Sequence, residues 1–284
     1  ADLTRLDIYF NGSESEASSV TINKYETNKK LRDLGFLVAE HQLVNKLEWQ
    51  LRGLDLCNEI SSKYGLPLIA KPADDGCSAA VRKIKSAEEL HLFMEAIFRE
   101  DVALSAVLCA ALNVKLNDEM PQKSDLLIEQ FIDRAGASKF LEVTGGMLTS
   151  YDKNGQISYE IFEPSESLAE SEILSLEEKF LAGQGQNLTP SRFSNTPQEQ
   201  IRISGEVRKT LQQVAIALNV TGYCRIDAFV RIFENGNVET IIIEVNSLPG
   251  MTPATCIYHQ AAINGYKPFE FIREILKFGE NRTA

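Results

Sequence analysis

Two apolar runs near the C-terminus, separated by an Asn-Gly pair, constrain the fold more than any other part of the sequence. Residues 223–230 and 240–245 are rich in β-branched and aromatic side chains, and Asn235-Gly236 lies between them. Asn and Gly tolerate the positive φ angles that both central positions of a type I′ turn require. The sequence therefore predicts an antiparallel hairpin with a type I′ turn centred between Asn235 and Gly236.

The expected register of this hairpin brings four polar side chains together. Side chains alternate along a strand, so Arg225 and Asp227 share one face of the first strand. Glu244 and Asn246 share one face of the second strand for the same reason. The predicted turn places Asp227 opposite Glu244 and Arg225 opposite Asn246.

Two facing carboxylates need a partner that offsets their charge. Residues directly opposed in an antiparallel pair have Cβ atoms about 5 Å apart, so Asp227 and Glu244 repel each other unless a proton or a cation lies between them. A hard divalent cation bound by oxygens of Asp227, Glu244 and Asn246 meets this need. The alternative is a solvated surface position, but the adjoining run 241–243 is typical of a buried strand. We therefore predict a metal site on this hairpin.

Composition bounds the class of protein. The chain has 284 residues, of which 44% are hydrophobic, which is enough for a sizeable core and two lobes. The sequence shows neither an apolar run of about 18 residues nor an N-terminal signal, so we expect a cytoplasmic protein without a membrane partner. The five cysteines lack metal-binding spacing and are expected to be reduced. A net charge of −11 argues against a nucleic-acid partner.

Apolar periodicity predicts a mixed α/β chain without internal repeats. Helices are expected over 23–34, 46–64 and 198–218, from Ser86 onward through a capping box, and in two short segments at the C-terminal end. Strands are expected over 66–72, 79–84, 126–132, 140–144 and 158–162. The stretch 163–200 is rich in Ser, Glu, Pro and Gly and is too long for a routine connection. Such a stretch is typical of a disordered loop or an active-site lid.

A lysine at a strand end is a candidate phosphate ligand. Lys71 precedes Pro72 and a loop that contains Gly76 and Ser78. Backbone N–H groups and a hydroxyl in such a loop bind phosphate, and an ammonium group neutralises its charge. The alternative is a lysine that extends into solvent, and the residues alone leave both interpretations open. Lys179, flanked by glutamates, is uninformative by itself, and the sequence contains neither a Walker A nor a dinucleotide-binding motif.

A sharp turn follows the second strand of the predicted hairpin. Pro249-Gly250 lies shortly after Asn246. Gly250 has no side chain, so its N–H group can approach a ligand closely. The turn alone is weak evidence for a binding site. Its position directly after the metal-binding strand, however, places it next to any ligand that the predicted metal binds.

Taken together, these segments resemble the ATP-grasp fold of the D-alanine–D-alanine ligase family. The match covers nearly all of residues 11–279, and its most specific part is the block 244–252. The remaining segments agree in order and spacing: Lys71-Pro72 with Gly76-Cys77-Ser78, Glu129-Gln130-Phe131-Ile132, Glu178-Lys179-Phe180 and the block 222–227. The resemblance implies an α/β (α+β) fold in which two subdomains grip ATP between antiparallel sheets.

The resemblance also implies a division of the chain. Residues 24–128 correspond to the small ATP-grasp subdomain, and residues 129–284 to the C-terminal subdomain with the metal site and a lid at 163–197. Residues 1–23 resemble only the exit from the family's N-terminal domain, which we expect to lie mostly outside this sequence. The family often dimerises through that domain, so a homodimer is expected of the full-length protein.

The implied activity is ATP-dependent joining of a carboxylate to an amine through an acyl phosphate, in peptidoglycan precursor synthesis, with D-amino acids or related acids as substrates. ATP would be bound by Lys24, Lys71, Ser78, Lys179 and the adenine-binding segment Glu129, Gln130, Phe131 and Ile132. Two Mg²⁺ ions, or Mn²⁺ in their place, would be bound by Asp227, Glu244 and Asn246. The catalytic groups would be Arg225, Lys179 and the Gly250 N–H, and Cys77, Phe180 and Thr255 would contact substrate.

Several residues depart from the family pattern. The Gly-Ser-Ser loop has Cys77 in place of its first serine, and Ala80 stands where a glycine follows. Phe180 replaces the lid tyrosine, as in ligases that accept D-lactate. The ribose-binding glutamate is not evident: Ser138 or Lys139 occupies its place, and Glu142 is out of register.

These departures keep other functions open. One is an ATP-grasp ligase for another acid–amine pair, such as D-alanine and D-lactate. Another is a non-catalytic nucleotide-binding module, and a weaker one is a scaffold that binds a polymer or a protein partner.

Overall fold

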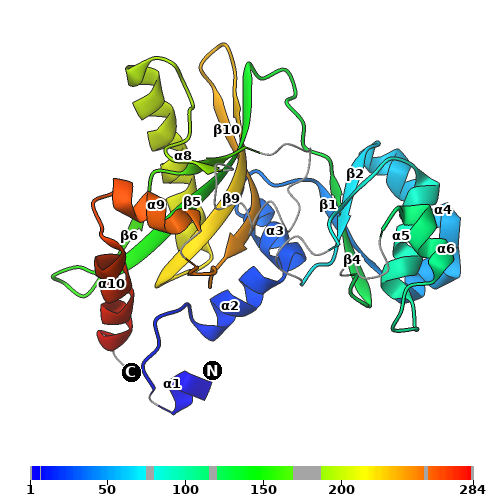
Figure 1. The fold of residues 1–284 in the computed structure, drawn as a ribbon, viewed down its shortest axis with the longest axis horizontal. Helices are drawn as coiled ribbons and strands as arrows, with labels where there is room; N and C mark the ends of the chain where they lie inside the picture. Colours follow the sequence, from blue (N-terminus) through cyan, green and yellow to red (C-terminus); the bar gives the residue numbers. More distant parts are fainter. Residues whose placement is uncertain are drawn as a thin grey trace.

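The computed structural model describes residues 2–6, 8–74, 80–114, 120–168, 187–252 and 255–282. Within these residues the chain forms two separate antiparallel sheets, each covered by helices (Figure 1). The predicted mixed fold with two lobes is therefore confirmed. No helix in the described part of the chain is long and apolar enough to cross a membrane.

The smaller lobe contains a four-stranded sheet in the order β1-β4-β2-β3. Its apolar face packs against three helices in one core (Figure 1). The strands are β1 (His41–Asn45), β2 (Leu68–Lys71), β3 (Arg82–Ile84) and β4 (Asp125–Gln130), and the helices are α4 (Lys46–Tyr64), α5 (Ala87–Phe98) and α6 (Ala106–Leu112).

The larger lobe contains a six-stranded sheet in the order β10-β9-β5-β7-β8, with β6 paired to β5. Helices α2 and α3 precede it in the chain, α8 packs on one face, and α9 and α10 pack on the other. The strands are β5 (Lys139–Tyr151), β6 (Ile157–Ile161), β7 (Ser165–Ser167), β8 (Asn187–Leu188), β9 (Tyr223–Ile232) and β10 (Val238–Asn246). The helices are α1 (Asp2–Arg5), α2 (Ser15–Ile22), α3 (Lys24–Asp33), α8 (Pro197–Ala217), α9 (Cys256–Ile263) and α10 (Pro268–Glu280).

Two adjacent glycines let helices approach both faces of β5. A Cβ atom on Gly145 would lie 2.4 Å from Leu211 Cδ1 on α8, and one on Gly146 would lie 2.4 Å from Gln260 Oε1 on α9. Neither separation is tolerated between real atoms, and successive residues of a strand face opposite sides. The Gly145-Gly146 pair therefore sets how closely α8 and α9 dock on the central strand.

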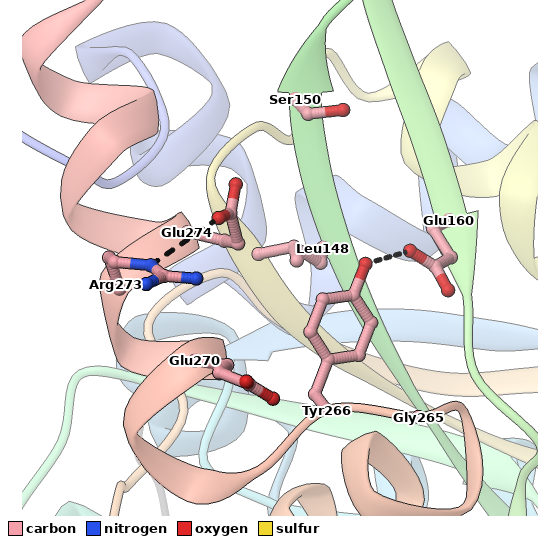
Figure 2. Close-up of a pocket in the computed structure, with 8 residues that line it drawn as sticks. All are labelled: Leu148, Ser150, Glu160, Gly265, Tyr266, Glu270, Arg273 and Glu274. Atoms are coloured by element: carbon pink, nitrogen blue, oxygen red, sulfur yellow. Dashed lines mark hydrogen bonds and ion pairs between the residues drawn. The ribbon is translucent and has the colours of Figure 1, made fainter.

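The far end of β5 forms a small pocket with α10. Leu148 of β5 and Tyr266, from the turn before α10, contribute to a cavity of about 270 Å³ (Figure 2). The Tyr266 hydroxyl donates a hydrogen bond of 2.6 Å to Glu160 on β6. This contact ties the C-terminal helices to the sheet at the end opposite to the small lobe.

Local signals in the sequence explain most element boundaries. Asn23 caps α3 by accepting hydrogen bonds from the backbone N–H groups of the first turn, and Ser86 caps α5 in the same way. The predicted helices over 23–34, 46–64 and 198–218 are confirmed within a residue or two. Of the predicted strand over 79–84, only Arg82–Ile84 forms a strand; residues 80 and 81 precede it as a turn and an irregular position, and residues 75–79 lie outside the described part.

The expected loop over 163–197 contains more regular structure than predicted. Strand β7 lies within it and pairs with β5 through Val143 and Thr144, and β8 pairs with β7. Residues 169–186 lie outside the described part of the chain. The division expected between residues 128 and 129 falls inside β4, whose last residues, Glu129 and Gln130, belong to the sheet of the small lobe.

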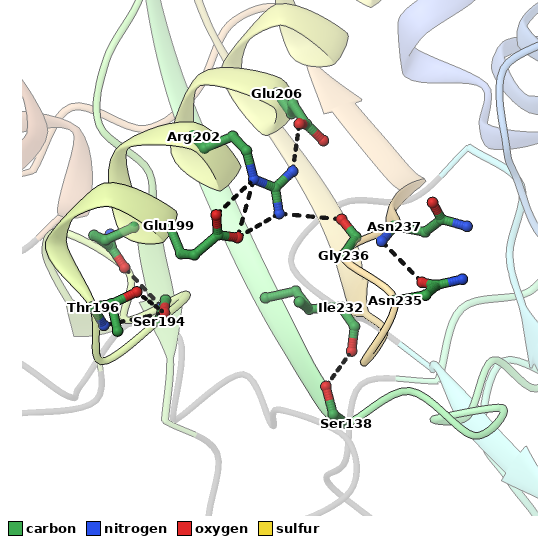
Figure 3. A network of polar contacts seen from close by, with 11 residues as sticks. Ser138, Ser194, Thr196, Glu199, Arg202, Glu206, Ile232, Asn235, Gly236 and Asn237 are labelled. Carbon is green, nitrogen blue, oxygen red and sulfur yellow. Dashed lines mark hydrogen bonds and ion pairs between the residues drawn. The ribbon is translucent and has the colours of Figure 1, made fainter.

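The hairpin of β9 and β10 is confirmed, but its turn is not of type I′. In the loop 234–236 only Gly236 has a positive φ, and Gly236 N donates to Phe233 O at 3.0 Å. Phe233 N donates in turn to Asn237 O, which closes a three-residue loop. Arg202 of α8 supports this turn by donating to Gly236 O (Figure 3). Near the turn the strands are consequently one residue out of the predicted register.

A β-bulge restores the predicted pairing farther along the hairpin. Ile242 lies opposite Ala228, but the next aligned pair is Glu244 with Asp227, so Ile243 is the additional residue. Without the bulge, Ile243 would face Asp227. The pairing of Asp227 with Glu244 is therefore confirmed, although the sequence argument reached it through the wrong turn.

Candidate active site

The polar residues of the hairpin lie on the face of the large sheet that carries α9. Asp227 pairs with Glu244 on one side and with Thr144 of β5 on the other. Arg225 lies between Asn246 and Gly146 in the same arrangement. The opposite face of these strands is apolar and buried in the main core. The sheet therefore separates the main core from the face on which these polar groups lie beside α9.

The Asp227 carboxylate is buried and held by two neighbours. Thr144 Oγ1 donates a 2.8 Å hydrogen bond to Asp227 Oδ1. Arg225 donates to both carboxylate oxygens, from Nε at 3.2 Å and from Nη2 at 3.3 Å. The negative charge of Asp227 holds the pKa of Arg225 above its ordinary value. The Asp227 carboxylate is thus fixed in orientation and lies against the Arg225 guanidinium.

Glu244 has its own set of partners. Lys24 Nζ, from the first residue of α3, lies 3.7 Å from Glu244 Oε2, and Arg225 Nη2 lies 3.8 Å from Glu244 Oε1. Asn246 Nδ2 donates to Glu244 Oε1 at 3.1 Å. Two cations therefore neutralise the two facing carboxylates in the described structure.

This donor set fits a hard divalent cation. Asp227 and Glu244 supply carboxylate oxygens, and the amide oxygen of Asn246 is a third ligand of the same class. Among the described residues no group of three His, Cys, Asp or Glu side chains is arranged to bind a metal. A metal here would accordingly be bound by two carboxylates and one amide, as the sequence predicted.

A second polar cluster lies on the small sheet. Lys71 Nζ is 2.7 Å from Glu129 Oε2, and both side chains are more than nine-tenths buried. The alternative that Lys71 extends into solvent is therefore wrong. Asn28 Nδ2 of α3 donates to the other oxygen of Glu129 at 2.8 Å. This cluster lies on the side of the sheet away from the helix-packed core.

Helix α3 connects the two clusters. Lys24 and Asn28 are four residues apart, so they lie on the same face of the helix. One contacts Glu244 on the large sheet, and the other contacts Glu129 on the small sheet. The backbone N–H of Lys24 also donates to Ala73 O, just after Lys71. The two lobes thus present charged groups toward each other around a single helix.

The remaining adenine-segment residues lie where β4 leaves the small sheet. Gln130 ends β4 and is exposed, and Phe131 and Ile132 follow it. The Phe131 ring has Lys83 Nζ over its face, 4.1 Å from the ring centre. These residues form the start of the connection to the large sheet.

The loop after β10 leads to α9. Gly250 is exposed, and Thr255 precedes the first turn of α9, with its hydroxyl donating to Thr252 O at 2.7 Å. Cys256 follows it and is buried. Burial raises the pKa of the Cys256 thiol to about 11, although the nearby Arg225 charge opposes this rise. The first turn of α9 therefore lies beside Arg225.

Four predicted site residues cannot be placed. Cys77, Ser78, Lys179 and Phe180 lie outside the described residues. Of the residues that depart from the family pattern, Ala80 has a φ of 52°, the left-handed conformation that favours glycine.

The three residues considered in place of the ribose-binding glutamate, Ser138, Lys139 and Glu142, lie in the described part of the chain. Ser138 Oγ donates to Ile232 O at 2.8 Å, and Lys139 donates to Arg192 O. Glu142 shares the face of β5 with Thr144.

Three polar residues of the site were not predicted from the sequence. Thr144 contacts Asp227, Asn28 contacts Glu129, and Gln260 contacts the backbone of Thr144. Only Thr144 was open to prediction, because a full register of β5 against β9 would have placed it opposite Asp227. The other two depend on helix packing, which the sequence pattern does not specify.

Comparison with known proteins decides the family. A family profile described as D-ala D-ala ligase C-terminus matches residues 30–108 and 105–277. The chain belongs to this family. A D-alanine–D-alanine ligase of Leptospira interrogans is 27% identical over 98% of this chain and 68% of its own length. A relative of the same description from Azobacteroides pseudotrichonymphae is 26% identical over 92% of this chain and 66% of its own.

Solved structures confirm the fold. The D-alanine–D-alanine ligase of Bacillus anthracis complexed with ATP superposes with a TM-score of 0.64 at 18% identity, over 98% of this chain and 72% of that one. The VanG D-Ala:D-Ser ligase of Enterococcus faecalis gives a TM-score of 0.67 at 17% identity, over 96% and 66%. The ATP-grasp fold and membership of an ATP-dependent ligase family are therefore confirmed. The roles of individual residues remain predictions.

Proposed function

We propose that this chain binds ATP between its two sheets and supports ligation of D-alanine, or a related acid, to a second small substrate through an acyl phosphate. The single observation that carries this proposal is the facing pair of Asp227 and Glu244, with Asn246, Arg225 and Lys24 around it. Membership of the ligase family supports the reaction class. The chain spans about two thirds of the length of its curated relatives, so the substrates are part of the proposal.

The residues of the large sheet would act on the phosphoryl group. Asp227, Glu244 and Asn246 would hold Mg²⁺, or Mn²⁺ in its place, which when bound neutralises phosphate oxygens during transfer. We infer two ions from the family resemblance. With a cation bound, the carboxylates of Asp227 and Glu244 would no longer need Lys24 and Arg225 to offset their charge. Both side chains could then interact with anionic groups of the substrates.

The residues of the small sheet would hold the nucleotide. Lys71 would contact a phosphate, and Glu129 with the segment 130–132 would line the base. Helix α3 couples these groups to the metal side, because Asn28 and Lys24 contact opposite lobes. Ser78 and Lys179 complete the proposed phosphate contacts.

Arg225 and the Gly250 N–H would stabilise the oxyanion that forms when the second substrate attacks the acyl phosphate. Thr255, Cys77 and Phe180 would contact the substrates. The segment 163–197 would cover the site and exclude water, which otherwise hydrolyses the acyl phosphate. We place the reaction in cytoplasmic peptidoglycan precursor synthesis and propose that the full-length protein forms a homodimer.

The test is release of phosphate from ATP and Mg²⁺ with D-alanine alone, and with D-alanine plus D-serine or D-lactate. Products are identified by mass spectrometry. Formation of a D-alanyl product supports the ligase and identifies the second substrate. Absence of phosphate release with every acid, in protein that still binds ATP, overturns the proposed substrates.

A matched pair of variants tests the metal assignment. Glu244 and Glu239 both lie on β10, and each lies within 4 Å of an arginine on β9. We expect Glu244→Gln to lower kcat by about 100-fold or more, because an anionic metal ligand is replaced by a neutral, weaker one. The kcat of Glu239→Gln should stay close to that of the unmodified protein. Equal activity and equal Mg²⁺ dependence in the two variants would refute the assignment.

A further inference from the structure

Gln260 is a fully buried amide in the second turn of α9. Its side chain is 0% exposed. Nε2 donates to Thr144 O at 2.6 Å and to Ser165 Oγ at 2.9 Å, whereas Oε1 has no hydrogen-bond partner in the described structure. Leaving a buried acceptor unsatisfied costs about 1–3 kcal/mol. An apolar side chain would avoid that cost, so burial alone does not explain a glutamine here.

The amide joins three elements beside the candidate active site. Gln260 lies on α9, Thr144 on β5 and Ser165 on β7. Thr144 uses its carbonyl to accept from Gln260 and its hydroxyl to orient Asp227. Ser165 Oγ is also 2.6 Å from Thr189 Oγ1, just beyond β8. The Gln260 side chain therefore connects α9 to the strand next to the carboxylates and to β7, and Ser165 continues this network to Thr189 beyond β8.

The fit of α9 on β5 is close enough to transmit small displacements. The space that a Cβ of Gly146 would fill is taken by Gln260 Oε1 at 2.4 Å and Ile257 Cγ1 at 3.0 Å. Gly146 is the residue of β5 directly opposite Arg225. Cys256, one turn before Gln260, lies beside Arg225 as well. The helix thus packs closely on the site strand at Gly146, and its first turn lies within electrostatic range of Arg225.

We propose that Gln260 is a positioning residue for the second substrate. Its two directional hydrogen bonds fix the rotation of α9 about its axis and the distance between α9 and β5. They thereby also fix the distance of Thr255 and the Gly250 loop from the Asp227–Glu244 pair. Apolar packing alone fixes such a distance less strictly, because it has no directional component. This inference rests on the proposed function for the identity of the substrate, but not for the docking of the helix.

The variant Gln260→Met tests the inference, because Met is similar in length and volume and has no N–H donor. Gln212→Met is the matched control: Gln212 on α8 donates from Nε2 to Tyr159 O on β6 at 2.7 Å, away from the polar face. For Gln260→Met we expect the KM of the second substrate to rise about 10-fold or more, since misplacement of reacting groups by about 1 Å has large effects. The affinity for ATP should change less than about 2-fold, and the melting temperature should match that of Gln212→Met.

Two outcomes overturn the inference. One is a KM for the second substrate equal to that of Gln212→Met. The other is a parallel loss of ATP affinity and melting temperature in Gln260→Met, which indicates a general structural role. Ser165→Ala, which removes one of the two acceptors, provides a second variant and should give an intermediate rise in KM. An unchanged KM in Ser165→Ala, together with unchanged KM in Gln260→Met, excludes positioning through the amide.

Hydrogen exchange separates this inference from the proposed function. Amides of residues 256–263 should exchange faster in Gln260→Met than in Gln212→Met, with α8 unchanged. If the unmodified protein releases no phosphate with any tested acid, the proposed substrates fail, and the exchange experiment still decides whether Gln260 holds α9. Unchanged exchange in α9 overturns the inference whatever the activity.

Discussion

Thr144 offers a test of whether Asp227 binds a metal. Its hydroxyl donates to Asp227 Oδ1 at 2.8 Å, and both side chains are less than one-tenth exposed. Thr144→Val replaces the hydroxyl by a methyl group of nearly the same shape. The substitution therefore removes one hydrogen bond from the carboxylate while leaving its packing in place.

The size of the effect follows from the kind of bond removed. A hydrogen bond to an ionised group contributes about 1.5–3 kcal/mol, and about 1.4 kcal/mol corresponds to a factor of ten in affinity. Arg225 still holds the carboxylate from Nε and Nη2, so the lower end of that range applies. We expect Thr144→Val to weaken the apparent Mg²⁺ affinity by about 10-fold, as is typical for residues that orient a metal ligand.

Two measurements test this expectation. One is the dependence of phosphate release on Mg²⁺ concentration, and the other is Mn²⁺ binding in the presence of nucleotide, measured by electron paramagnetic resonance. Thr149→Val is the matched control, because Thr149 lies on the same strand and its hydroxyl contacts the backbone of Gly222 instead of a carboxylate. Thr149→Val should lose stability without a change in metal affinity. Thr144→Ser should restore binding.

The reasoning is refuted if Thr144→Val and Thr149→Val bind Mn²⁺ equally well and respond equally to Mg²⁺. That result would mean either that Asp227 is not a metal ligand or that its orientation does not depend on Thr144. A loss of thermal stability in both variants, without a difference in metal binding, would give the same conclusion.

Three further predictions concern stability. Gly145→Ala should lower the free energy of unfolding by about 1–3 kcal/mol, because its Cβ would lie 2.4 Å from Leu211 Cδ1; Gly205→Ala, in an open position on α8, should raise it by up to about 1 kcal/mol in the same urea titration. Ala80→Gly should raise it by roughly 0.5–1 kcal/mol by relieving the positive φ, and an unchanged urea midpoint would contradict this. The pKa of the Cys256 thiol is raised from 9.0 to about 11, so the unfolded chain loses that proton first and the free energy of unfolding should fall as pH rises through this interval. Cys256→Ala should reduce the pH slope in urea titrations at pH about 8 and about 10, and an identical slope would show that Cys256 does not contribute.

The ends of the helices could be predicted from the sequence because the signals that set them are local. Asn23 and Ser86 cap their helices through side-chain oxygens that accept from the next turn, and Gly65 ends α4 with a positive φ. Each of these contacts spans only a few residues. The predicted boundaries of α3 and α4 agree with the structure for this reason.

The geometry of the hairpin could be predicted only in part from the sequence. Alternation correctly indicated which side chains share a face, whereas the pairing of Asp227 with Glu244 was reached through a turn type that the structure does not have. The turn has positive φ only at Gly236, and the bulge at Ile243 compensates for the resulting change of register. A bulge depends on how the strands pack and twist in the sheet, so a local pattern does not reveal it.

The burial of Lys71 depends on the tertiary structure. A lysine at a strand end can extend into solvent or be buried with a partner, and the sequence left both interpretations open. The partner, Glu129, is brought within 2.7 Å by the pairing of β2 with β4 across a long separation in the chain. Strand order within a sheet depends on many weak contacts together, which no single motif encodes.

The sequence by itself determined the class of fold, the hairpin and the shared faces of its polar residues, because alternation, caps and turn residues act over a few positions. The facing of Asp227 and Glu244 also required the bulge at Ile243. Only the tertiary structure decided which groups surround that pair. Thr144 reaches Asp227 from β5, Lys24 reaches Glu244 from α3, and Gln260 joins α9 to β5. Each of these contacts joins residues that are distant in the chain, and each exists because sheets and helices bury their apolar faces together and leave their polar faces opposed.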